Sequence, residues 1–226
     1  MNKSWFLVLV IVFPVYSSSK GLVVYTKGKS YLTRDGQKKE IQIRTLIEEK
    51  DIITTEKESS LHVQLANGVM IRIGANTKIE FEKILKAIQQ YEYKLVLRQG
   101  EVLTKIDKQK EKRIQFDVQA PTAIASVRGT EFLMDADTKK TLIAVNDGSL
   151  MVMDINQKER VILNSGEKII ATYEAFEKSL LEDYEKKKFE LLQEFEKTRQ
   201  KNLEILIQQL ESNQKIIEEQ KKKLKN

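Results

Sequence analysis

Few residues of this chain have the types and spacing that chemistry requires. The sequence contains one histidine, His62, and no cysteine. It therefore excludes a disulfide, a thiolate metal site, a cysteine nucleophile and an acylated-cysteine lipid anchor. No second imidazole is present to share a metal with His62. His62 falls in an alternating apolar segment, which indicates a surface or half-buried structural histidine on the face opposite the aliphatic side chains.

Carboxylates are abundant, but they form no recognisable catalytic pair. Glu48-Glu49 and Glu218-Glu219 are neighbours in charged stretches, where nothing would remove water from one carboxyl group to make it a general acid. The sequence also lacks a Gly-x-Ser-x-Gly elbow and a complete phosphate-binding glycine loop. We therefore expect no enzyme, no cofactor and no metal site.

One stretch, QAPTAIASVRGTEFLMD at residues 119–135, combines small residues with a glycine inside a strand pattern. Gly129, preceded by Arg128, indicates a bulge or a tight corner with a guanidinium nearby. Arg128 either binds an anionic group of a ligand or partner, or ties down carbonyls or the Glu131 carboxylate at the corner. We favour the structural interpretation, and Arg128, Gly129, Thr130 and Glu131 are the candidate contact or corner residues.

The composition is that of a globular protein with a basic balance. Of 226 residues, 41% are hydrophobic and 32% charged, and the net charge is +6. A basic protein attracts anionic surfaces. Basic and acidic residues alternate here, however, and no Arg-rich cluster is interleaved with aromatic residues, so we expect no nucleic acid partner.

The N-terminal sequence, MNKSWFLVLVIVFPVYSSSK, has the pattern of a secretory signal peptide. A lysine precedes an apolar run of about eleven residues, and small serines follow it. The run is shorter than the roughly 20 residues of a membrane-spanning helix. We predict a signal peptide at residues 1–19, cleavage near Ser19, no integral span in the mature chain and a location outside the cytoplasm.

Residues 20–170 show the period of β-strands. Apolar residues recur at every second position in short runs punctuated by Gly, Asn and Asp. The pattern predicts a mainly β domain, arranged as an antiparallel β sandwich, a roll or a short solenoid.

Turns with a glycine separate several of these runs. In SLHVQLANGVMIRI, the Asn67-Gly68 turn places two sets of three aliphatic side chains on one face. Gly100, Gly148 and Gly166 follow a similar pattern, and we predict that all four glycines supply the positive φ of hairpin turns.

The last segment, residues 171–226, has another period. It contains no Gly or Pro, is rich in Glu, Lys, Leu and Gln, and therefore predicts one long charged helix. Its apolar positions form a coiled-coil-like seam that includes Leu203, Leu206, Leu210, Ile217 and Leu224. Residues 181–224 thus predict a homo-oligomer or docking on a partner. A solvated single helix is the alternative, because many Glu/Lys pairs four residues apart would help to hold it.

Ordered motifs over about residues 45–170 resemble the FecR-type domain of bacterial envelope proteins. They are DIITTEKESSLHVQLANGVMIRIGANTKIEF, LRQGEV, APTAIASVRGTEF, VNDGSLMV and LNSGEKI. In well-known members this domain lies in the periplasm after one membrane span, receives a signal from an outer-membrane transporter and belongs to a regulator of a sigma factor. The resemblance implies an all-β periplasmic interaction module without catalysis. This chain has a predicted signal peptide in place of the sigma-binding segment and span, so it is similar to the stand-alone secreted form.

Three roles follow as expectations. The first is a periplasmic or secreted FecR-type protein that binds an envelope protein of unknown identity, with the helix mediating oligomerisation or docking. The second is a component of cell-surface signalling that acts through a separate membrane partner. The third is binding of an envelope polymer such as a glycan or peptidoglycan on the polar strand faces.

Overall fold

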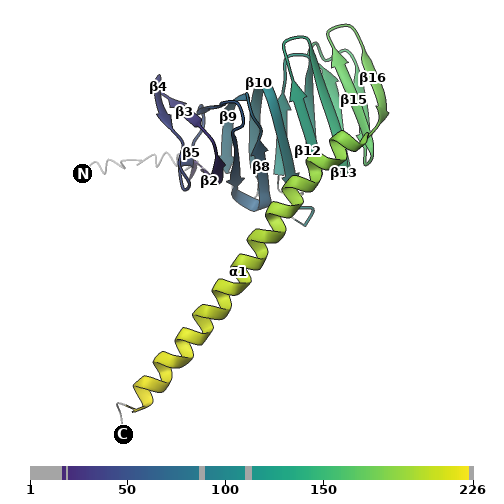
Figure 1. Ribbon diagram of the computed structural model, residues 1–226. Coiled ribbons are helices and arrows are strands. Elements are labelled where there is room, and N and C mark those ends of the chain that lie inside the picture. Colours follow the sequence, from purple (N-terminus) through teal and green to yellow (C-terminus); the bar gives the residue numbers. More distant parts are fainter. Residues whose placement is uncertain (1–16, 19, 87–89, 110–113, 224–226) are drawn as a thin grey trace, which may run out of the picture.

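The computed structural model describes residues 17–18, 20–86, 90–109 and 114–223. A β domain is followed by one long helix, α1 (Asp183–Lys223), which crosses the domain and then leaves it (Figure 1). The expected mainly β fold with a long C-terminal helix is confirmed. The predicted signal peptide lies outside the described residues except for Ser17–Ser18, which form β1 and pair with β9.

Three long strands bend and thereby belong to two sheet layers: β10 (Tyr91–Ile106), β12 (Ala123–Ala136) and β13 (Lys140–Asp154). The first half of β10 pairs with β9 and β11, whereas its second half pairs with β8 and β12. The other strands are β2 (Gly21–Lys27), β3 (Ser30–Arg34), β4 (Gln37–Glu40), β5 (Leu46–Ile47), β6 (Ile52–Thr55), β7 (Ser60–Leu65), β8 (Val69–Ile73), β9 (Lys78–Lys86), β11 (Ile114–Gln119), β14 (Arg160–Asn164), β15 (Glu167–Thr172) and β16 (Phe176–Leu180).

The two layers lie face to face and form a sandwich. The layer that carries the helix, here called the helix-side layer, has the order β16-β15-β13-β12-β10-β8-β7-β2-β5. The opposite layer, here called the far layer, has the order β14-β13-β12-β11-β10-β9-β6-β3-β4. Alternating side chains of both layers meet between them, as period-2 strands require.

One pairing departs from the antiparallel expectation, since β10 and β11 run parallel. The chain leaves β10 in the helix-side layer and returns to the far layer beside the start of the same strand. Such a return makes a solenoid-like coil, and a strand that re-enters on the same side must run parallel to its neighbour.

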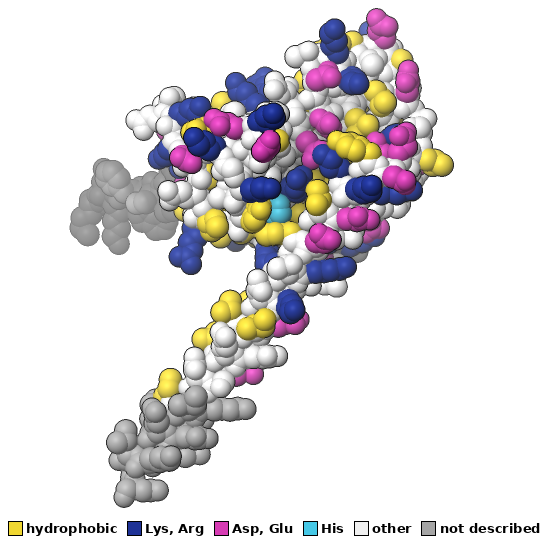
Figure 2. All heavy atoms as spheres, viewed as in Figure 1, with side chains coloured by type: hydrophobic (Ala, Val, Ile, Leu, Met, Phe, Trp, Pro, Cys, Tyr) yellow, Lys and Arg dark blue, Asp and Glu magenta, His cyan; other side chains and the backbone are white. Residues whose placement is uncertain are grey.

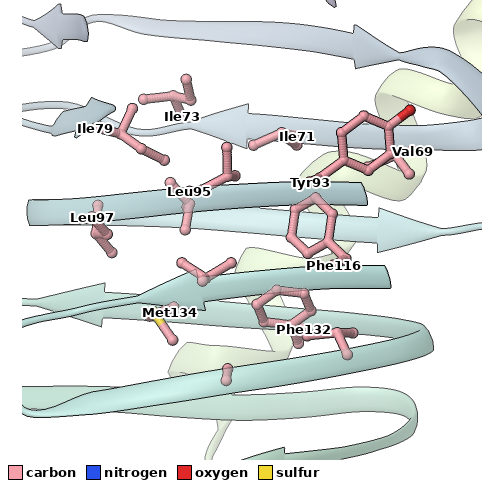
Figure 3. Packing of buried hydrophobic residues seen from close by; sticks show 14 of the residues in the cluster. Val69, Ile71, Ile73, Ile79, Tyr93, Leu95, Leu97, Phe116, Phe132 and Met134 are labelled. Carbon is pink, nitrogen blue, oxygen red and sulfur yellow. The ribbon is translucent and has the colours of Figure 1, made fainter. Parts of the chain in front are cut away.

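The main core lies between the layers and is aliphatic and aromatic (Figure 3). Leu61, Val63 and Leu65 of β7 pair opposite Ile73, Ile71 and Val69 of β8, and all six are buried. Tyr93, Phe116 and Phe132 pack in sequence beside them, with ring centroids 6.0 and 6.2 Å apart. The predicted hairpin and its aliphatic core face are therefore confirmed.

The hairpin interpretation of the other glycines is corrected. All four have positive φ, but only Gly68 lies in the connection of two strands paired with each other. Gly100 and Gly148 lie inside β10 and β13, where these strands change layer. Gly166 connects β14 to β15, which both pair with β13 and lie in different layers. A corner between layers and a hairpin turn need the same positive φ, so the glycine alone does not distinguish them.

The helix begins at Asp183 rather than at residue 171. The preceding residues turn at Thr172–Ala175 and form β16, which extends the edge of the helix-side layer beside β15. Pairing with β15 outweighs the helix propensity of this short segment.

Candidate interaction site

The corner predicted at Arg128 lies where β12 bends. The pairing of β12 with β13 shifts on both sides of Glu131, which marks a bulge, and Gly129 has a φ of 55°. Thr130 Oγ1 donates a hydrogen bond to the Ser149 carbonyl at 2.8 Å. The Arg128 side chain lies outside the described part of the structure, so its predicted role stays a prediction.

Glu131 is buried in this corner. Its Oε2 accepts a hydrogen bond from Asn146 Nδ2 at 3.0 Å, while its buried Oε1 has no partner among the described residues. It borders a cleft of ≈ 460 Å³ at the place where α1 leaves the sheet. The cleft walls carry ion pairs between Lys105 and Glu196 and between Lys108 and Asp147. The cleft thus has mixed charge, and the described residues contain no cluster of acidic, histidine or cysteine side chains fit for a metal ion.

The first half of α1 packs on the outer face of the helix-side layer. Phe189 and Leu192, 1% and 0% exposed, form a second apolar cluster with Met70, Leu103 and Leu133. The sequence predicts that this strand face is polar and open. That expectation is wrong for the part of the face beneath the helix, because the helix removes it from water.

His62 is buried in this interface rather than half-exposed at the surface. Its ring lies 4.0 Å from that of Phe195 and 4.9 Å from that of Tyr25, measured between centroids. Burial, together with the nearby Arg72 charge, lowers the pKa of His62 to about 4. A neutral ring between two aromatic rings is a packing element, and no described residue hydrogen bonds to its Nδ1.

Ion pairs surround the apolar contact at the start of the helix. Lys168 Nζ on β15 lies 3.0 Å from Glu185 Oε1, and both side chains are buried. Glu101 binds Lys188 at 2.6 Å and Arg72 at 3.0 Å. Burial opposes the charged form of Lys188, but its hydrogen bond to Glu101 prevails and its pKa is raised. Buried charges of this kind persist only when paired, so they fix where the helix sits.

Sequence reasoning did not find these ion pairs. Lys168 lies in the strand Glu167–Thr172 and Glu185 in a helix rich in charge. The local sequence around each residue is the same as that around an exposed charged residue. Only packing between distant parts of the chain brings the two together.

The second half of α1 leaves the domain (Figure 1). From Gln200 onward every described side chain is exposed. The predicted seam residues Leu203, Leu206, Leu210 and Ile217 are 57%, 55%, 62% and 50% exposed, and Leu224 lies outside the described residues. Apolar side chains gather along one edge of this protruding part (Figure 2). Its helical state agrees with the prediction, whereas the role of the seam stays a prediction.

None of the helices in the described ranges has the length and apolarity that crossing a membrane requires.

The comparisons with known proteins identify the β domain. Residues 51–151 match the family model described as FecR protein. The resemblance to FecR seen in the motifs is therefore confirmed over these residues. A search of curated proteins finds no match.

The structure is also similar to two crystal structures, at 2.50 and 1.65 Å resolution, of a protein from Parabacteroides distasonis provisionally described as an anti-sigma factor. The TM-scores are 0.48 and 0.47, each with 17% sequence identity. The aligned region covers 57% of this chain and 59% of the other, so it spans less than two thirds of that protein. We draw no function from this likeness.

Proposed function

We propose that this chain is a non-enzymatic FecR-type interaction module of the bacterial envelope, in which the β domain holds a helix that mediates oligomerisation or docking. The observation that carries the proposal is the aliphatic seam of the protruding part of α1. Exposed apolar surface in a continuous stripe is typical of an interaction site. The FecR domain supports a regulatory role with partner proteins.

The proposed location follows from the signal-peptide pattern of residues 1–19. Cleavage near Ser19 would release a mature chain that begins at Lys20 in the periplasm or outside the cell. Intact-mass measurement of the protein from the envelope fraction tests this directly. A chain that keeps Met1 and fractionates with the cytoplasm would contradict it.

Cross-linking in intact cells followed by affinity capture tests the partner role. We expect the full chain to capture an envelope protein, and we expect the triple variant Leu203→Gln, Leu206→Gln, Leu210→Gln to lose it. Ile205→Gln is the matched control, since Ile205 is 43% exposed on the same part of the helix but off the seam. Equal capture by all three proteins would contradict the role of the seam, and no envelope protein captured would contradict the partner role.

The same experiment tests the signalling alternative, which the FecR domain also favours. In that case the captured protein is an inner-membrane protein or an outer-membrane transporter. Mass spectrometry of the cross-linked peptides identifies it.

A further inference from the structure

One heptad phase runs along the whole of α1. The positions that repeat with alternating spacings of three and four residues include Glu185, Phe189 and Leu192, which are 4%, 1% and 0% exposed on the sheet. They continue as Glu196 and Arg199, which bind Lys105 and Gln64. The same phase then continues as the exposed seam, from Leu203 to Ile217. The apolar stripe that packs on the sheet therefore continues, in one heptad phase, into the stripe that protrudes.

The protruding part needs a partner to cover this face. Gln200–Lys223 is about 36 Å long at 1.5 Å per residue, and every side chain described in it is exposed. Leucines repeating in heptads, with Ile207 on the flank, match the side chains with which a second helix interlocks. We propose that this partner is the same segment of a second copy of the chain, and that the two helices run antiparallel. The proposal rests on the proposed function in taking α1 as the interaction element.

The β domain sets the direction of the second helix. Because the seam continues the docked face, its apolar side chains lie along the edge of the protruding part that is on the side of the β domain (Figure 2). A parallel helix on this seam would continue upward into the domain beyond Arg199. The antiparallel helix of a second copy instead brings Lys223, the last described helical residue, to this point beside the cleft at the helix exit. Full overlap of the protruding segments then places Gln200 opposite Lys223 of the second copy and Leu206 opposite Ile217 of the second copy.

A polar residue of the seam falls near the centre of this antiparallel pair. Asn213 then lies next to the two-fold axis, where a polar seam residue fixes the register at some loss of stability.

Cysteine cross-linking of the purified protein tests the inference, because the native chain has no cysteine. Leu206→Cys and Ile217→Cys are prepared separately as full chains, oxidised mildly alone and then as a mixture. We expect at least about tenfold more disulfide-linked dimer in the mixture than in either variant alone. Ile205→Cys, mixed with each of them, is the control off the seam and should not cross-link.

Two outcomes would overturn the inference. Efficient linkage of each variant with itself means a parallel pair, and a monomeric mass in sedimentation at about 100 μM means no pair. Circular dichroism of each variant confirms that it is folded, which these exposed positions should allow. No envelope partner is present in this experiment, so its result does not depend on whether such a partner exists.

Discussion

Acid should weaken the docking of α1, because His62 is buried as a neutral ring between the sheet and the helix. Its pKa is about 4 in the folded protein and 6.5 in the unfolded chain. The unfolded or undocked state therefore takes up a proton first as the pH falls. The stabilisation that the neutral His62 ring provides is fully present above about pH 6.5. It is lost progressively as the pH falls from 6.5 to about 4.

The magnitude follows from these two values. Relative to neutral pH, linkage gives a loss of about 2 kcal/mol at pH 5 and about 3 kcal/mol at pH 4. The charged groups nearest the ring do not relieve this loss. Arg72 on β8 is itself a cation and lowers the pKa further, and the helix contributes Phe195. No carboxylate among the described residues pairs with the ring, so an imidazolium there would be a buried charge without a described partner.

Urea unfolding of the full chain at several pH values between about 5 and 8, followed by circular dichroism, measures the effect. His62→Phe is the matched variant, since it keeps a ring beside Tyr25 and Phe195 but does not titrate. Carboxyl groups contribute equally to both proteins, including Asp135, whose pKa is raised by burial and then by Glu101. The difference between the two profiles therefore belongs to His62. Parallel profiles over this range would refute the reasoning.

Two further predictions concern the bend of β10 and the packing of α1 on the helix-side layer. Gly100→Ala should lower the free energy of unfolding by about 2–5 kcal/mol. The positive φ contributes about 1–2 kcal/mol. Crowding contributes about 1–3 kcal/mol, because the added Cβ would lie 2.5 Å from Thr77 Cα. Gly36→Ala, at a φ of 77° with nothing within 4 Å, should show only the first cost in the same urea assay, and equal losses would contradict the steric account. Leu192→Ala removes a side chain that is 0% exposed and should cost about 2–5 kcal/mol. Leu191→Ala, at a residue 47% exposed, should cost less than about 1 kcal/mol; a similar shift of the thermal midpoint in both would mean that the helix does not pack as described.

The alternation of apolar residues predicted the strands because a strand in a sandwich exposes one face to the core. The hairpin of β7 and β8 followed from local sequence, since its two strands pair with each other. The bends at Gly100 and Gly148 did not follow from local sequence. A bend is defined by the distant strands that pair with the chain before and after it. In Gly100 the close neighbour is Thr77, which belongs to another part of the chain.

A signal for the docked helix was present in the sequence. Val102-Leu103, Phe132-Leu133-Met134 and Ile143-Ala144-Val145 place apolar residues on both faces of their strands, and all of them are buried. Strands buried on both faces have continuous apolar runs rather than alternation. These runs indicate that the outer face of the helix-side layer is buried by another element. They do not indicate that this element is the helix α1 of the same chain.

The seam of α1 also shows where packing within the chain ends. At the positions that face the sheet, the helix uses Glu185, Glu196 and Arg199 beside its apolar residues, and the sheet supplies Lys168, Lys105 and Gln64 to meet them. In a second helix with the same sequence these charges would have no such partners. From Leu203 to Ile217 the equivalent positions carry no charge and are aliphatic except for Asn213, and the side chains there are exposed. Within one heptad phase, the loss of charged residues therefore separates a half of the helix that packs on its own domain from a half suited to another helix.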